Sequence, residues 1–288
     1  MKDKIPCSPV IQWAGGKRQL LPDILNCIPK EYGTYYEPFF GGGALFFELQ
    51  PNKAIVNDNN PMLINVYNQI KTNCKQVALL IDRYQDRFNS LTTDEQRKGY
   101  YYSLRKKFNE KIKNNELSPT SAALFIFINR ACFNALYRVN KNGEFNVPLG
   151  SKKKINAYGL DNFQAVSQCL KKVELLNGDF EEACKSVETG DFVFFDSPYW
   201  GTFDTYQAGG FTPKDHERLA DLYKQLSKNG VYCMLTNSNT EFIKSLYSDY
   251  NIEIVNVKRN INSEVNNRVG EEIIVTNYKK EGENYGSI

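Results

Sequence analysis

The sequence predicts an α/β protein whose mostly parallel sheet is interrupted by a helical insert. First, Asp191–Phe195 consists mainly of strand-forming residues with no polar face, which is typical of a strand buried on both sides of a parallel sheet. Second, residues 34–49 read as a strand, a glycine turn and a helix, the opening unit of a nucleotide-binding sheet. Third, residues 61–129 carry apolar residues at helical spacing before strand-like segments resume at Val173.

The composition is that of a globular protein with one large or two ordinary domains. The chain has 288 residues, of which 41% are hydrophobic and 24% charged, and its net charge is only +3. The whole chain is therefore not a strongly basic nucleic-acid binder. It contains no 18-residue apolar window, which excludes a membrane span, and its first residues lack the apolar core of a signal peptide.

Cysteine and histidine usage narrows the chemistry. The seven cysteines are odd in number, widely spread and without a C-x-x-C pair, which indicates reduced thiols in a cytoplasm and not a disulfide framework or zinc site. The one histidine, His216, rules out a His-rich metal site, and we expect no metal. Its place on the first turns of a predicted helix favours a surface position over a catalytic one.

Two glycine-containing segments near the amino end favour a ligand site. Gly15-Gly16 permits a close turn, and Lys17 then opens a helical pattern that could hold an anion, although a plain loop is the alternative because the P-loop spacing is absent. Phe39–Gly43 follows a short strand and precedes a helix at Ala44–Leu49. The third glycine of a dinucleotide fingerprint is missing, because position 46 is Phe.

A second strand, Ala54–Asp58, follows the glycine turn and ends in an acid. An acid at this point can accept hydrogen bonds from the hydroxyl groups of a ribose. The glycine turn and Asp58 together therefore favour a cofactor that contains adenosine.

The insert is predicted to be mainly helical and basic. Helical spacing covers 61–71, 77–89, 93–115 and 120–129, and the third of these segments has seven basic residues against three acids. A solvated helix face explains that segment equally well. In 129–154, six basic residues face one acid, and Asn142-Gly143 between strand-forming flanks predicts a β-hairpin. Its arginine, amide and aromatic groups suit nucleic acid, with a basic hairpin that has no partner as the alternative.

After the insert, the alternation of strands and helices resumes. We expect strands at 173–177, 191–195, 231–236, 252–257 and 272–276, and helices at 181–187, 213–227 and 241–247. Residues 200–211 form an aromatic loop, and 258–270 is polar enough to be disordered without a partner. Asp196-Ser197-Pro198-Tyr199 ends the buried strand, where open α/β sheets bind ligands, although an ordinary turn has the same residue types.

The order of these motifs resembles the Dam/DpnM-type (D12 class, alpha group) DNA adenine-N6 methyltransferases. The resemblance spans about residues 11–278 and rests on Trp13–Lys17, Glu37–Gly43, Asn57-Asp58, Arg130 with Asn134–Arg138, Asn146–Pro148, Gly178–Phe180 and Asp196–Tyr199. It implies a Rossmann-like class I S-adenosylmethionine-dependent methyltransferase sheet with an inserted DNA-recognition domain that carries the β-hairpin. The catalytic domain would comprise 1–60 and 160–288, and the recognition domain 61–159.

The family resemblance also implies a role for each matching residue. S-adenosylmethionine would contact Trp13, Lys17, Phe39, Gly41, Gly43, Asp58, Asp179, Phe180 and Asp196, with Asp58 on the ribose and Asp179 and Phe180 on the adenine. The catalytic group would be Asp196, Ser197, Pro198 and Tyr199. Duplex DNA would contact Arg130, Phe133, Asn134, Leu136, Arg138 and Lys141, and the match around Arg138 is most similar to GATC-methylating members.

The implied reaction needs neither metal nor covalent intermediate. The target adenine would be flipped out and stacked on Tyr199, while Asp196 and a carbonyl of the following turn accept its N6 hydrogens. The resemblance further implies a cytoplasmic, nucleoid-associated enzyme of bacterial or phage origin, with a possible cognate restriction endonuclease as partner. The oligomeric state stays open.

One departure from the family pattern keeps alternatives open. The usual tetrapeptide is D-P-P-Y, and here Ser197 replaces the first proline, which frees the φ angle at that position. We expect an active enzyme. A catalytically weak or silent nucleic-acid-binding relative is one alternative, and a methyltransferase for cytosine N4, RNA or protein is another. A nicotinamide-dependent oxidoreductase is disfavoured by the missing glycine and the lack of a catalytic histidine.

Overall fold

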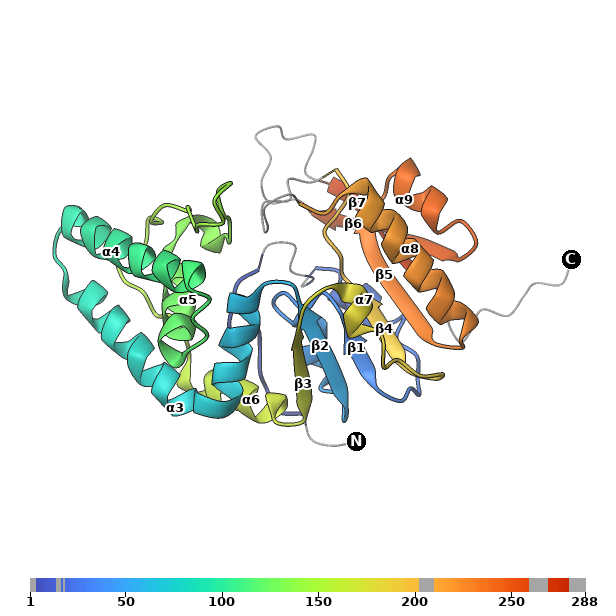
Figure 1. Ribbon diagram of the computed structural model, residues 1–288, viewed down its shortest axis with the longest axis horizontal. Coiled ribbons are helices and arrows are strands. Elements are labelled where there is room, and N and C mark those ends of the chain that lie inside the picture. The colour runs from blue at the N-terminus through green and yellow to red at the C-terminus, as the bar shows by residue number, and fades with distance from the viewer. Residues whose placement is uncertain (1–3, 14–16, 18, 202–209, 259–268, 280–288) are drawn as a thin grey trace, which may run out of the picture.

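One mixed β-sheet organises the chain (Figure 1). The computed structural model describes residues 4–13, 17, 19–201, 210–258 and 269–279. Within them, the sheet has the order β3-β2-β1-β4-β5-β7-β6, and all pairs are parallel except those of β7 with β5 and β6. The strands are β1 (Tyr35–Glu37), β2 (Ala54–Asp58), β3 (Val173–Asn177), β4 (Phe192–Phe195), β5 (Tyr232–Ser238), β6 (Asn251–Lys258) and β7 (Val269–Thr276). The predicted α/β class is confirmed.

Strand β4 is buried on both faces, as its apolar sequence predicts. Phe192 and Phe194 pack into one hydrophobic core, whereas Val193 and Phe195 pack into a second core on the opposite face. The chain runs from β1 outward to β2 and β3, then returns to β4 on the other side of β1. The order therefore reverses between β1 and β4, and in open α/β sheets ligands bind at the carboxyl ends of the strands at such a point.

Helices flank the sheet on both sides. They are α1 (Leu21–Leu25), α2 (Ala44–Leu49), α6 (Leu160–Leu170), α7 (Phe180–Ala183), α8 (Pro213–Lys228) and α9 (Glu241–Leu246). Helix α8 begins with the predicted cap, in which Thr212 and Asp215 bond each other's backbone N–H groups. The sequence analysis missed α6, and the helix predicted at 181–187 ends at Ala183.

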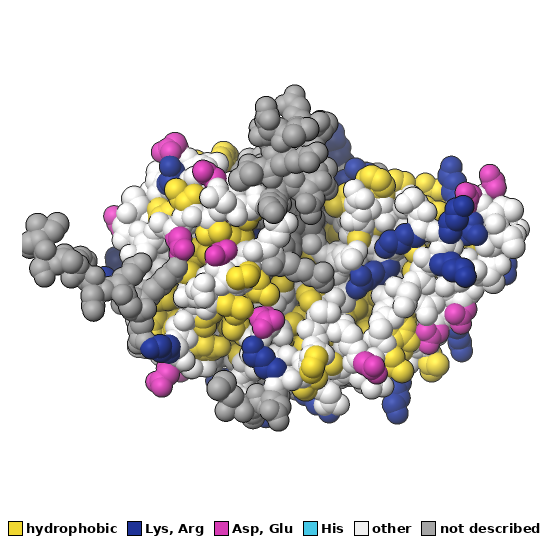
Figure 2. All heavy atoms as spheres, turned by 180° about the vertical axis from the view of Figure 1, so that it is seen from behind, with side chains coloured by type: hydrophobic (Ala, Val, Ile, Leu, Met, Phe, Trp, Pro, Cys, Tyr) yellow, Lys and Arg dark blue, Asp and Glu magenta, His cyan; other side chains and the backbone are white. Residues whose placement is uncertain are grey.

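The insert consists of three helices that stand beside the sheet (Figure 1). They are α3 (Pro61–Ser90), α4 (Asp94–Lys113) and α5 (Pro119–Ala131). The two helices expected at 61–71 and 77–89 are the two parts of α3, which follow each other across a kink at Asn73, where the backbone angles are not helical. Helix α5 is buried almost throughout, and seen from behind, basic side chains gather over the insert (Figure 2).

The β-hairpin predicted around Asn142-Gly143, within 129–154, forms only two isolated bridges, Cys132 with Leu149 and Val139 with Phe145, and residues 132–149 are called the bridged segment. Side chains of α4 explain why no regular strand forms in this stretch. Tyr101, Arg105 and Asn109 donate hydrogen bonds to the carbonyl oxygens of Val147, Asn146 and Phe145, respectively. These carbonyls are thus held by the insert's own helix, and the 3-10 turn η1 (Phe133–Ala135) shapes the other arm.

The surface position expected for His216 is wrong. His216 is 2% exposed, and its ring meets those of Trp200, Phe211 and Phe242 edge-on. Burial lowers the pKa of His216 to about 4, so its imidazole is neutral at physiological pH. His216 therefore faces an aromatic cluster, whereas Pro213 and Lys214 in the same turn are exposed.

Some expectations lie outside the described residues. These are the Gly15-Gly16 turn, most of the aromatic loop at 200–211 and most of the segment 258–270. Along the described chain, no helix is long and apolar enough to span a membrane, and no cluster of three His, Cys, Asp or Glu residues could hold a metal ion. All seven cysteines, each within the described residues, are free thiols.

Candidate active site

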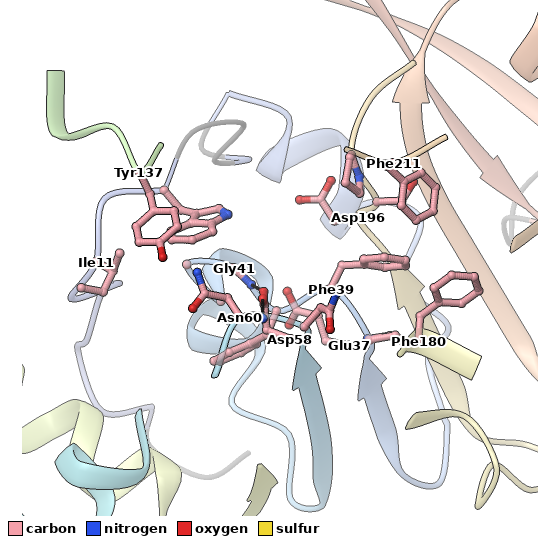
Figure 3. A pocket seen from close by; sticks show the side chains of 18 of the residues that line it. Ile11, Glu37, Phe39, Gly41, Asp58, Asn60, Tyr137, Phe180, Asp196 and Phe211 are labelled. Carbon is pink, nitrogen blue, oxygen red and sulfur yellow. Dashed lines mark hydrogen bonds between the residues drawn. The ribbon is translucent and has the colours of Figure 1, made fainter. Parts of the chain in front are cut away.

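A cavity of about 970 Å³ opens at the carboxyl ends of the central strands (Figure 3). Its lining includes every residue that the sequence analysis assigned to cofactor binding or catalysis: Trp13, Lys17, Phe39, Gly41, Gly43, Asp58, Asp179, Phe180, Asp196, Ser197, Pro198 and Tyr199. They come from segments far apart in the chain. The cavity lies where the strand order reverses, between the ends of β1 and β4.

The glycine turn after β1 brings the backbone close to its neighbours. Gly41 and Gly43 have φ angles of +49° and +67°, which favour glycine. A Cβ atom at Gly41 would lie 2.9 Å from the indole of Trp13, and one at Gly43 would lie 2.6 Å from the ring of Phe40. Both the backbone angle and the close approach therefore require glycine at these positions.

Asp58, at the end of β2, is tied to this turn. Its Oδ2 accepts a hydrogen bond of 2.9 Å from the N–H of Gly41, and its Oδ1 accepts one from the N–H of Asn60. Desolvation in the pocket raises the pKa of Asp58 to about 6, although these two hydrogen bonds oppose the shift. Ionised Asp58 is therefore a fixed acceptor that faces the cavity (Figure 3).

Asp179 and Phe180 follow β3 on the other side of the cavity. Phe180 stacks on Phe39 at 5.3 Å between ring centres, and Phe211 meets Phe39 edge-on. Asp179 caps α7 through Oδ1, which also accepts a 2.9 Å hydrogen bond from Nη2 of Arg218. Arg218 in addition bonds Glu181 and Asp215, so one guanidinium holds three carboxylates at this edge.

Asp196 follows β4 and points into the cavity (Figure 3). Its Oδ1 lies 2.5 Å from Nζ of Lys17 and accepts a 2.9 Å hydrogen bond from Thr236. Burial raises the pKa of Asp196 above its usual range, and the Lys17 ammonium opposes that rise.

Tyr199 completes the group. Lys17 Nζ lies 4.4 Å from the centre of the Tyr199 ring, and the phenol donates a 2.7 Å hydrogen bond to Glu272 on β7. The Lys17 ammonium thus contacts both Asp196 and the Tyr199 ring, at a point of the cavity where a polar amine attached to a flat ring would meet the same two residues. Ser197, between them in the chain, is 2% exposed.

The residues predicted to bind DNA lie on the bridged segment beside the cavity, with one exception. Phe133 is 51% exposed, and Asn134, Arg138 and Lys141 are also exposed. Leu136 is half-buried, and Asn134 reaches the cavity wall. Arg130, by contrast, is directed at the fold, because its guanidinium donates a 2.7 Å hydrogen bond to the carbonyl oxygen of Val10.

The insert also contacts the cavity through Tyr137. Its ring stacks on the indole of Trp13 with 5.3 Å between centres, which joins the bridged segment to the amino-terminal segment. Tyr137 is one of several cavity or supporting residues that the sequence analysis did not assign, together with Glu37, Phe211, Arg218, Thr236, Asn237 and Glu272. Glu37 and Tyr137 lie inside motifs of the family resemblance, and Phe211 ends the predicted aromatic loop, whereas the others adjoin the site through the tertiary fold.

Comparisons with known proteins agree with this geometry. A family model described as "D12 class N6 adenine-specific DNA methyltransferase" matches residues 13–261. The type II methyltransferase M1.LlaDCHI of Lactococcus lactis is 41% identical to the chain, and the match covers 96% of the chain and 98% of the relative. The type II methyltransferase M.MjaIII of Methanocaldococcus jannaschii is 40% identical over 94% and 99%. A DNA adenine methylase of Haemophilus influenzae is 29% identical over 93% of each chain.

Proposed function

The chain belongs to the D12 class N6 adenine-specific DNA methyltransferases, and we propose that it methylates adenine N6 in GATC or a related site of duplex DNA after flipping the adenine out of the helix. The mixed sheet with its flanking helices is the class I methyltransferase fold. The observation that carries the proposal is the group of Asp196, Tyr199 and Lys17 around one point of the cavity. A base inside a duplex cannot reach that point, which is why flipping is part of the proposal.

The family implies S-adenosylmethionine as methyl donor, and the cavity residues fit it. The cavity volume of about 970 Å³ is larger than one such molecule and leaves room for a base. Asp58 offers acceptors for the ribose hydroxyls, and the rings of Phe39 and Phe180 offer apolar contact to an adenine. Asp179 Oδ2 takes no hydrogen bond from any described residue and is available to the adenine amine. When bound, the donor supplies an electrophilic methyl group.

The chain's own residues then prepare the target amine. Asp196 and a backbone carbonyl of the Ser197-Pro198 turn each accept one N6 hydrogen, which draws the nitrogen towards tetrahedral geometry and stabilises positive charge as it attacks. The Tyr199 ring stacks on the base, and its hydrogen bond to Glu272 fixes the ring. Lys17 and Thr236 both contact Oδ1 of Asp196 in the structure, so the amine meets a carboxylate that already bonds an ammonium through one of its two oxygens.

The insert is proposed as the DNA-recognition domain over 61–159, with the catalytic domain in 1–60 and 160–288. Exposed Phe133 and half-buried Leu136 are placed to wedge between bases, and Arg138 can read a guanine through two hydrogen bonds. Asn134 and Lys141 add polar contacts to DNA. Arg130 supports this surface from within, because its guanidinium is bound to the backbone of Val10.

The relatives' names bear on the biological setting. Two of them are named type II methyltransferases, which supports a cognate restriction endonuclease as partner of this chain. Sequencing of DNA from a host that lacks adenine methylation, with and without the expressed chain, tests the proposed function. We expect N6-methyladenine at GATC or a related motif. Unmodified adenine throughout would refute the activity, and methylation at an unrelated motif would refute only the site.

A further inference from the structure

The last three residues of β5 hold the segment that follows β4. Phe195 pairs with Leu235 in the sheet, so the next residues of the two strands continue side by side. Thr236 donates a hydrogen bond to Asp196, and Nδ2 of Asn237 donates one of 3.2 Å to Oγ of Ser197. Three hydrogen bonds further along tie this strand end to Trp200 and to itself.

Asn237 is the centre of this arrangement. It is fully buried, and its Oδ1 accepts hydrogen bonds from the N–H groups of Trp200 at 3.0 Å and Ser238 at 2.9 Å. Its Nδ2 faces Ser197, which is itself 2% exposed. One side chain therefore spans the Asp196–Tyr199 tetrapeptide, with a donor at its second residue and an acceptor just beyond its end.

Ser197 stands where a D-P-P-Y tetrapeptide has a proline. A proline ring fixes φ near −65° covalently, whereas serine leaves that angle free. The following Pro198 restricts Ser197 to extended angles but does not fix it. Holding one backbone residue in a single conformation costs conformational entropy. A buried hydrogen bond to the serine side chain is a means of holding the residue without the ring.

We propose that Asn237 is a positioning residue that fixes the Asp196–Tyr199 turn through Ser197 and Trp200, in place of the proline ring. The proposal rests on the proposed function, because it assumes that this turn presents Asp196, Tyr199 and a backbone carbonyl to the target adenine. It makes the serine a working member of the site and supplies the constraint that the first proline gives in a D-P-P-Y turn. A shift of the reacting groups by about 1 Å can cost about a hundredfold in rate.

Rescue by proline tests the inference. With cofactor and DNA saturating, Asn237→Ala should slow single-turnover methyl transfer about ten- to a hundredfold, with cofactor KM within about threefold of wild type. Adding Ser197→Pro to Asn237→Ala should recover about tenfold, because the ring restores the constraint. Adding Ser197→Ala should recover nothing. Equal rates of the two double variants, or a full rate in Asn237→Ala, would overturn the proposal.

A matched control separates positioning from general loss of stability. Asn277 bonds the backbone of Val231 and Cys233 at the other end of β5, far from the turn. Asn277→Ala should lower Tm without slowing methyl transfer. If Asn237→Ala does not fold, Ser197→Ala and Ser197→Gly test the role of Asn237 instead. Loss of the Ser197 Oγ alone should slow methyl transfer about tenfold. Wild-type rates in both would refute the inference.

Hydrogen exchange gives a readout that does not need methyl transfer. The amides of Tyr199 and Trp200 should exchange faster in Asn237→Ala than in Asn277→Ala, and Ser197→Pro should slow them again. A wild-type chain without activity on DNA would refute the proposed function, and exchange would still decide the role of Asn237. Unchanged exchange in Asn237→Ala would refute that role even if the enzyme is active.

Discussion

The ammonium of Lys17 lies 2.5 Å from Oδ1 of Asp196 and 4.4 Å from the centre of the Tyr199 ring. It thus stands where the amine of a flipped adenine would meet the same two residues. The ammonium also compensates the charge of a carboxylate that is otherwise desolvated, and so it opposes the rise that burial causes in the pKa of Asp196. In the proposed reaction, the N6 amine of the base meets this same carboxylate.

The contact between Lys17 and Asp196 predicts that Lys17 affects the pH dependence of activity. The active form is the carboxylate, so activity is lost as pH falls through the raised pKa of Asp196. Lys17→Met removes the group that lowers this pKa, and the acid limb of kcat/KM for DNA should move to higher pH, since kcat/KM reports the free enzyme. Lys17→Arg, which keeps the charge, is the control. An acid limb at the same pH in Lys17→Met would contradict the expectation.

Asp58 predicts a second pH effect, on cofactor affinity. Its pKa is about 6, and the ionised form accepts the ribose hydroxyl hydrogens. Affinity for S-adenosylhomocysteine, measured by calorimetry, should therefore be full above pH 7 and fall as pH drops through about 6. Asp58→Asn should bind more weakly, with an affinity that no longer changes in this range. A wild-type affinity that stays constant from pH 7 to about 5 would argue against ribose binding by Asp58.

Arg218 is expected to set the affinity for the adenine ring. It bonds Asp179 Oδ1 and leaves Oδ2 for the adenine amine, while its guanidinium lies 4.9 Å from the centre of the Phe180 ring. Arg218→Gln should weaken S-adenosylhomocysteine binding about tenfold, in proportion to the loss of one charge-assisted hydrogen bond. The variant's preference for S-adenosylhomocysteine over S-inosylhomocysteine, which lacks the amine, should shrink as well. A preference equal to that of the wild type would show that Arg218 does not act through Asp179.

Arg138 and Lys141 offer a matched pair on the proposed DNA-binding surface. Arg138→Ala should reduce the free-energy preference for the correct base at one base pair by about 1–3 kcal/mol. Lys141→Ala should weaken binding to all sequences alike and reduce the slope of log binding constant against log salt concentration by about 1. Competition binding with single-base variants of the site, at several salt concentrations, measures both. A uniform loss in Arg138→Ala would assign it to the phosphate backbone.

Sequence reasoning was strongest where one local pattern has one structural solution. The apolar run of β4, the glycine turn and the Thr212 cap each specify their structure within a few residues, and the motifs they carry meet in one cavity. It failed where tertiary contacts decide. His216 is buried because aromatic rings from three segments of the chain surround it, and the bridged segment lacks strands because α4 binds its carbonyl oxygens. Likewise, no local signal links Asn237 to Ser197, 40 positions apart.

The most direct test of the account follows a labelled methyl group. The purified chain is incubated with S-adenosylmethionine carrying a trideuterated methyl group and duplex DNA containing GATC, and the nucleosides are analysed by mass spectrometry. The wild type should yield labelled N6-methyldeoxyadenosine, and Asp196→Ala, which keeps cofactor binding measurable by calorimetry, should yield none. Label on cytosine, no label on DNA, or equal labelling by Asp196→Ala would contradict an adenine methyltransferase that acts through Asp196.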